Sequence, residues 1–410
     1  MTHGISGRSR PAVCSAARIR SSPSSRKMAR ALLLILIAAL VGVIGWSGEP
    51  LTLPLAMLFP ALWALARRRT IAALVAAAYF LAASRGLPQG VANFYGSDIW
   101  PGLFLWLVAS LAFVAIHGLL WISRPGGRAA RFALAAALMA VPPFGIVGWA
   151  HPLTAAGVLF PRWGWLGLTA AVVGLIMMMT RAWPLVAILL GGIWLWSAAT
   201  WTAPPLPDRF RGVDLDMGQS LGRDGTLARQ RDLITSVTRA GGQGATIVVL
   251  PESALGFWTP SVERLWRDAL ASSDIAVIAG AAVIDPQGYD NVLVAISARD
   301  AGILYRERMP VPVSMWQPWR RWLGQDGGAR AHLFANPTVE LAGRRIAPLI
   351  CYEQLVVWPI LQSMLHRPDA IVATGNGWWT VGTSIIDIQN ASTIAWARLF
   401  DVPLVTAFNR

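Results

Sequence analysis

The stretch I-A-P-L-I-C-Y-E-Q, from Ile346 to Gln354, indicates how the C-terminal half of this chain is built. It begins with a short apolar run and continues into Cys351, Tyr352 and Glu353. A run of this length is typical of a strand that is buried on both faces. Such a strand delivers the residue that follows it to the edge of a sheet, which is a suitable place for a nucleophile.

Cys351 is one of only two cysteines, and the other, Cys14, lies in a basic and polar N-terminal stretch. We therefore expect no disulfide framework and a single thiol at position 351. One interpretation is an ordinary buried side chain, because free cysteine is among the most buried residue types. The other interpretation is a nucleophile, and the residues at the neighbouring strand ends decide between the two.

The composition divides the chain into two unlike halves. Of the 410 residues, 55% are hydrophobic and 14% are charged, which is too apolar for an ordinary soluble domain. Residues 1–206 carry 16 basic and two acidic residues, whereas residues 207–410 carry 19 of each sign. The net charge of +14 therefore belongs to the apolar half, as expected for a membrane protein. The neutral second half argues against direct binding of nucleic acid.

A basic arm at 1–30 precedes a series of apolar segments. These segments lie at 31–46, 51–66, 70–84, 101–122, 132–149, 164–180 and 182–200. Their lengths are close to what a helix needs to cross a bilayer, so we predict a membrane domain of about seven helices over 31–206. With the arm in the cytoplasm, most basic residues fall in cytoplasmic loops and residues 207–410 lie outside. The sequence leaves open whether the chain starts at Met1 or Met28. It also leaves open whether 86–96 is a plain loop or the rim of a lipid site.

Residues 207–410 alternate apolar strands with helical segments, which predicts an α/β layered domain. Strands are expected at 213–217, 245–250, 275–282, 292–297, 303–305, 346–351, 370–374 and 404–408. Three of them end in polar or reactive residues: Glu252, Cys351 and Asn376. Ligands of open α/β sheets lie beyond the C-terminal ends of strands. A carboxylate and a thiol at one rim predict a general base and a nucleophile.

Three motifs carry a resemblance to a known family: L-P-E-S at 250–253, Y-R-E-R at 305–308 and I-C-Y-E at 350–353. They resemble the nitrilase, or carbon–nitrogen hydrolase, superfamily. With the apolar segments in front, the chain is similar to the apolipoprotein N-acyltransferases. Through R-M-P-V-P-V-S-M-W at 308–316 it resembles the TraB group of conjugal transfer proteins more closely.

This resemblance implies a nitrilase-like αββα sandwich for residues 207–410, short at its C-terminus. It also implies a Glu–Lys–Cys triad in which Glu252 is the general base and Cys351 is the nucleophile. No cofactor or metal is expected. The residues expected to bind the substrate are Tyr352, Glu353, Asn376 and Trp378.

One residue departs sharply from that pattern. The lysine of the triad corresponds to Glu307, and the only lysine of the chain, Lys27, lies in the N-terminal arm. A lysine at this place offers a positive charge to a developing oxyanion, and a carboxylate would repel it. Arg306 and Arg308 are the candidates to supply the missing charge, although a guanidinium differs from an ammonium in geometry.

Two functions follow. The first is a multi-pass protein of the bacterial inner membrane, with residues 207–410 in the periplasm and a degraded or altered site, that assists conjugal plasmid transfer. Its partners would be a membrane lipid or lipoprotein, or conjugation and cell-envelope proteins. The alternative is an active N-acyltransferase that moves an acyl chain from phospholipid, through a Cys351 thioester, to a lipoprotein or another amine.

Overall fold

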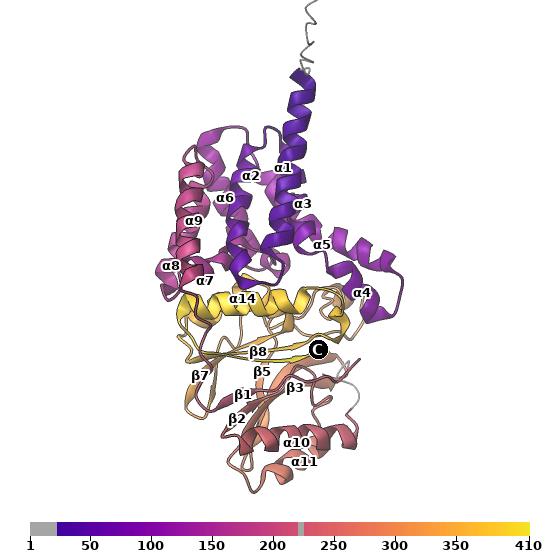
Figure 1. Ribbon diagram of the computed structural model, residues 1–410. Coiled ribbons are helices and arrows are strands. Elements are labelled where there is room, and N and C mark those ends of the chain that lie inside the picture. The colour runs from indigo at the N-terminus through magenta and orange to yellow at the C-terminus, as the bar shows by residue number, and fades with distance from the viewer. Residues whose placement is uncertain (1–22, 220–224) are drawn as a thin grey trace, which may run out of the picture.

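The computed structural model describes residues 23–219 and 225–410. Within these ranges, a bundle of helices stands on one side of an α/β half that is built around two sheets (Figure 1). The chain passes from one half to the other between the end of the last apolar helix at Ala199 and the first strand at Phe210. Cys14 and most of the predicted arm at 1–30 lie outside the described residues. The rest of the arm, residues 23–30, belongs to the first helix.

Helices occupy the apolar segments of the first half. They are α1 (Pro23–Gly45), η1 (Pro50–Leu58), α2 (Phe59–Leu65), α3 (Arg69–Ala83), α4 (Leu87–Tyr95), α5 (Ile99–Leu120), α6 (Pro125–Ala140), η2 (Phe144–Val147), η3 (Pro152–Ala155), α7 (Ala156–Leu159), α8 (Gly164–Met177) and α9 (Trp183–Ala199). Two of them, α1 and α5, are long and apolar enough to cross a membrane, and the pair α3 and α4, bent by 49°, makes a third if it counts as one span. The remaining apolar helices are shorter than a full span.

The helical half differs from the prediction in three places. Segment 51–66 is broken into a 3₁₀ and an α-helix, because Pro54 and Pro60 lack the backbone N–H that a continuous helix needs. Helix α6 starts at Pro125, so the predicted loop 123–131 is largely helical and the predicted helix 132–149 ends at Ala140. Of the two interpretations of 86–96, the plain loop is wrong, since residues 87–95 form α4.

The second half contains two sheets. The five-stranded sheet has the order β1 (Phe210–Gly212), β2 (Ile247–Val249), β3 (Ala276–Asp285), β4 (Gly288–Ile296), β5 (Ala301–Arg306). The four-stranded sheet has the order β6 (Val339–Leu341), β7 (Arg344–Ile350), β8 (Ala370–Asn376), β9 (Leu404–Asn409). The stretch quoted at the outset forms the end of β7, which pairs in parallel with β8, and the 3₁₀ turn that follows it.

The two sheets pack face to face and helices cover both outer faces (Figure 1). Buried side chains of β1 to β5 and of β7, β8 and β9 fill the space between the sheets. Helices α10 (Leu227–Gly242) and α11 (Pro260–Leu270) cover the five-stranded sheet, while α13 (Val357–Met364) and α14 (Ile385–Phe400) cover the four-stranded one. Because both faces of the central strands are buried, their sequences are continuous apolar runs. The predicted αββα layering is therefore confirmed.

The ends of the sheets were predicted less well. The strand expected at 213–217 lies at 210–212, and Leu215 contributes only an isolated bridge to Asn409. Strand β6 was not predicted, since three residues at a sheet edge leave no periodic pattern to detect. A four-residue helix at 319–322, α12, was also missed.

Helix α14 joins the two halves of the molecule. It lies between the four-stranded sheet and the helical bundle, so that both of its sides are covered (Figure 1). Its backbone contacts α7 very closely: a β-carbon added to Gly157 would stand 1.6 Å from the carbonyl oxygen of Ala395. Only glycine fits there, so this contact sets how the bundle sits on the α/β half.

Replacing Gly157 by alanine should therefore weaken the packing of the two halves. We expect Gly157→Ala to lower the unfolding free energy by about 1–3 kcal/mol, because overpacking forces the backbone apart. The measurement is thermal unfolding of the full chain in detergent. Gly192→Ala on α9 is the matched control, since no atom lies within 4 Å of its added β-carbon. Equal melting temperatures for the two variants would contradict the close contact.

Candidate active site

Cys351 stands at a sharp turn where β7 passes into the 3₁₀ turn η4 (Cys351–Gln354). Its backbone is left-handed, with φ 45°, a conformation that is uncommon for a residue with a side chain. Strain of this kind is found preferentially at functional positions, where it directs a side chain out of the strand. The thiol is 5% exposed and accepts a weak contact from Nε2 of Gln389 on α14, at 3.7 Å.

Glu252 lies beyond the end of β2 and reaches the same place from the other sheet. The next residue, Ser253, is also left-handed, with φ 60°. The loop passes so close to β3 that a β-carbon on Gly280 would stand 2.5 Å from the Cα of Glu252. The Oε1 atom of Glu252 accepts a hydrogen bond from Nδ2 of Asn291 at 2.8 Å. The predicted base is therefore buried and held by the protein itself.

Glu307 is joined to Glu252 through the same amide group. Nδ2 of Asn291 donates to Oε2 of Glu307 at 2.9 Å, so one NH₂ group bridges two carboxyl groups. Glu307 is 1% exposed, and its Oε1 atom is buried with no hydrogen-bond partner among the described residues. The structure thus brings together Glu252, Glu307 and Cys351, as the sequence predicted.

Burial and mutual repulsion disfavour the ionised forms of Glu252, Glu307 and Cys351. Burial raises the pKa of Glu252 to about 7, against the opposing effect of its contacts with Asn291 and Cys351. Burial, and then the charges of Glu252 and Glu353, raise the pKa of Glu307 well above its usual range. Burial, and then the charges of Glu252 and Glu307, raise the pKa of Cys351 well above its usual range. The surroundings therefore favour the protonated form of Glu307 and the neutral form of the thiol.

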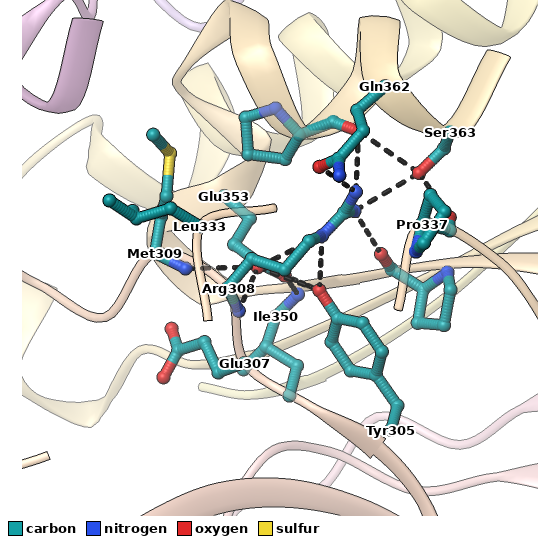
Figure 2. Close-up of polar contacts among 12 residues, drawn as sticks. Tyr305, Glu307, Arg308, Met309, Leu333, Pro337, Ile350, Glu353, Gln362 and Ser363 are labelled. Carbon is teal, nitrogen blue, oxygen red and sulfur yellow. Dashed lines mark hydrogen bonds and ion pairs between the residues drawn. The ribbon is translucent and has the colours of Figure 1, made fainter. Parts of the chain in front are cut away.

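The arginines beside Glu307 do not replace the missing lysine. Arg306 forms an ion pair with Asp290 at the rim of the five-stranded sheet. Arg308 turns away from Glu307 toward α13, as Figure 2 shows. Its guanidinium is fully buried and donates to backbone and side-chain oxygens of Tyr305, Pro348, Pro359, Gln362 and Ser363.

Glu353 belongs to the Arg308 network. Its carboxylate accepts hydrogen bonds from the hydroxyl of Tyr305 and from the backbone N–H groups of Ile350, Arg308 and Met309 (Figure 2). It also lies 3.7 Å from Nε of Arg308. The protein thus occupies both carboxylate oxygens of Glu353. Its predicted part in substrate binding stays a prediction, without support from these contacts.

The other three predicted binding residues also have partners within the protein. Tyr352 donates its hydroxyl hydrogen to the carbonyl of Ile146 in the helical half, at 2.6 Å. Asn376 ends β8 and its Oδ1 accepts from Nδ2 of Asn409 at 2.8 Å. Trp378 stacks on Phe94 of α4, with ring centroids 5.6 Å apart. Their assignment to substrate binding stays a prediction.

Sequence reasoning missed two polar residues of the site, Asn291 and Gln389. Asn291 is a buried amide in β4, directly before the apolar run 292–296, and a buried polar residue at that place could have served as a signal. Gln389 lies on the covered face of α14, where a polar residue among apolar ones was likewise visible. Neither residue could be assigned to the thiol until the fold had brought β4 and α14 to the end of β7.

Comparison with known proteins places this site in a family. The carbon-nitrogen hydrolase family matches residues 81–398. The conjugal transfer protein TraB of Agrobacterium fabrum is 62% identical over 420 aligned residues, covering 100% of both chains. The chain belongs to the carbon–nitrogen hydrolase family, as one of its TraB-type members.

Two further relatives complete the comparison. A probable conjugal transfer protein TraB of Sinorhizobium fredii is also 62% identical, over 92% of this chain and 97% of the relative. Among solved structures, a variant of the Nesterenkonia AN1 amidase from the nitrilase superfamily is 12% identical, with a TM-score of 0.37 over 49% of this chain and 74% of that one. At this TM-score the two structures differ too much for a residue-by-residue comparison.

The buried ion pair makes a first prediction for the site. Arg308→Met should lower the unfolding free energy by about 3–5 kcal/mol, because it leaves the Glu353 carboxylate buried without its counter-ion. Arg345→Met is the matched control: Arg345 pairs with Glu340 at 3.0 Å on the surface, and loss of that pair should cost less than about 1 kcal/mol. Thermal unfolding of the full chain measures both, and equal losses would contradict the structural role of Arg308.

The raised pKa of the thiol makes a second prediction. Iodoacetamide reacts with the thiolate, so alkylation of Cys351 should be slow at pH 7 and should accelerate only above the usual cysteine range. Glu307→Lys should speed the reaction at pH 7, because a cation favours the thiolate. Glu340→Lys, at an exposed position of β6, makes the same change of charge outside the site and should leave the rate of alkylation unchanged. Peptide mass spectrometry separates Cys351 from Cys14, and an unchanged rate in Glu307→Lys would contradict the electrostatic account.

Proposed function

We propose that this TraB-type protein is a membrane-embedded accessory of conjugal transfer whose hydrolase site is altered. The observation that carries the proposal is the buried Glu307, which shares an amide donor with Glu252 and stands where the triad has a lysine. Burial, and then the charges of Glu252 and Glu307, raise the pKa of the Cys351 thiol, which makes it a weak nucleophile. In this proposal the domain binds a lipid, a lipopeptide or an envelope protein during plasmid transfer and has weak or no turnover.

The membrane placement in this proposal is supported by composition and helix length. Helices α1 and α5 meet the requirement for spanning a bilayer, and their exposed faces carry many large apolar side chains. The excess of basic residues before residue 207 favours a cytoplasmic N-terminus. We accordingly propose a multi-pass protein of the inner membrane, with residues 207–410 in the periplasm.

A second candidate function is acyl transfer through the same thiol. The strained turn at Cys351 and the Glu252 pKa of about 7 favour it, because that pKa suits a general base at neutral pH. Glu252 would take the thiol proton while the sulfur attacks an ester carbonyl of a phospholipid. A thioester would then form, and the lysophospholipid would leave with the proton from Glu252. Attack by an amine would release the amide and restore the thiol.

Mating experiments with Cys351→Ala distinguish the two functions. The accessory function predicts that the variant, expressed at the wild-type level, supports plasmid transfer as well as the wild type does. Deletion of the gene serves as the positive control for a phenotype, and Cys351→Ser serves as the near-isosteric variant. Loss of transfer in both variants, together with an acyl adduct on Cys351 in the wild-type protein, would overturn the accessory function and establish acyl transfer.

A further inference from the structure

One buried arginine has most of its guanidinium without a partner. Arg398 lies in the last turn of α14 and is 5% exposed. Its Nε and Nη1 atoms are buried and have no hydrogen-bond partner among the described residues. Only Nη2 donates, to the hydroxyl of Ser197 on α9 over a long 3.4 Å. A buried cation with no counter-ion among the described residues and a single long hydrogen bond is strongly disfavoured, so this position favours an anion.

The end of the helix does not supply the missing acceptors. A cation is favoured in the last turn of a helix, where carbonyl groups lack partners. Here, however, the carbonyl of Ala397 accepts from the N–H groups of Asp401 and Val402, and the carbonyl of Arg398 accepts from the N–H of Arg162. The centre of the Trp201 ring lies 3.7 Å from the guanidinium carbon of Arg398. A ring stacked on the guanidinium cannot accept hydrogen bonds from its N–H groups, because these groups point outward in the guanidinium plane.

A small cavity opens beside Arg398, at the junction of the two halves. Arg162, Thr202, Pro204, Arg398 and Asp401 are among the residues that line it. Its volume of about 20 Å³ has room for one oxygen-sized group, while the rest of a ligand can lie at the open mouth. Asp401, the only acid of the lining, is exposed and already pairs with Nε of Arg162 at 3.2 Å. The cavity therefore keeps a net positive charge.

The titration of Arg398 agrees with this geometry. Burial, and then the charge of Arg162, lower the pKa of Arg398 to about 10. A guanidinium that faced a carboxylate inside the protein would be shifted in the opposite direction. A bound anion would reverse the shift, since a phosphate oxygen accepts charge-assisted hydrogen bonds from a guanidinium.

The place of the cavity indicates the source of the anion. Helix α9 ends at Ala199, and the lining segment 202–205 follows it directly. The outer face of α9 is strongly apolar, with Leu185, Ile188 and Leu195 each at least 70% exposed. A lipid phosphate lies just beyond the apolar layer that such a face requires. We propose that Arg398 binds the phosphate group of a membrane phospholipid at the junction of α9 and α14.

This site is separate from the thiol but lies on the same helix. Gln389, which contacts the sulfur of Cys351, precedes Arg398 by nine residues, or about 13 Å along α14. The lipid source rests on the membrane placement proposed above, whereas the anion site itself rests only on Arg398 and its cavity. An experiment can therefore disprove the lipid source without disproving the anion site.

Thermal unfolding of the full chain in a maltoside detergent tests the proposal with three probes. Dioleoylphosphatidylglycerol carries the phosphate and the chains, dioleoylglycerol carries the chains alone, and inorganic phosphate carries the anion alone. We expect a rise in melting temperature with the first probe only. In Arg398→Gln the apparent affinity should fall about tenfold or more, the effect of losing a charge-assisted contact. Arg264→Gln, an exposed arginine on α11, should behave as the wild type does.

Each remaining outcome decides against part or all of the proposal. An equal rise with dioleoylglycerol, or full retention of the phospholipid effect in Arg398→Gln, would overturn it. An equal rise with inorganic phosphate would assign the site to a free anion and overturn the lipid source. No rise with any probe would leave only water in the cavity. If Arg398→Gln does not fold, Arg398→Lys replaces it, because it keeps the charge but loses the fork and should weaken the phospholipid effect.

Discussion

The carboxylate of Glu353 is the constraint on which the site depends. It accepts hydrogen bonds from the backbone on both sides of the sandwich, at Ile350 beside the thiol and at Arg308 beside Glu307. The positions of Cys351 and Glu307 are therefore fixed by the same buried charge. Arg308 neutralises that charge from the side of α13, away from the thiol. The guanidinium of Arg308 is thus engaged in contacts that hold the fold together.

Much of the α/β half could be predicted from the sequence, because its central strands are buried on both faces and leave continuous apolar runs. Residues that follow such runs, Glu252 and Cys351, were found for the same reason. Asn291 and Gln389 were not, because their roles come from contacts between elements far apart in the chain. The sequence suggested Arg308 as a source of positive charge because of its residue type alone. The structure shows that its side chain is directed to α13 and not to Glu307.

The helical half was harder to predict, because hydropathy locates apolar residues but not the ends of helices. Prolines inside apolar segments, such as Pro54, divide what appeared to be single spans. The stretch 86–96 contains glycines and a proline, which favour a loop, yet residues 87–95 form α4. Asn93 and Phe94 of that helix contact the turn around Trp378, so it lies against the thiol-bearing domain. Tertiary contacts thus overrode local preference at the place where the two halves meet.

The neutral state of Cys351 also bears on the chemical durability of the protein. Oxidants and disulfides react with thiolates, and a thiol kept protonated by burial and by two neighbouring carboxyl groups offers little thiolate to them. In an oxidising compartment, an exposed thiol of ordinary acidity would be converted to a sulfenic acid or a mixed disulfide. Burial, and then the neighbouring carboxyl groups, raise the pKa of the thiol, and the same shift that would weaken it as a nucleophile would also slow its oxidation.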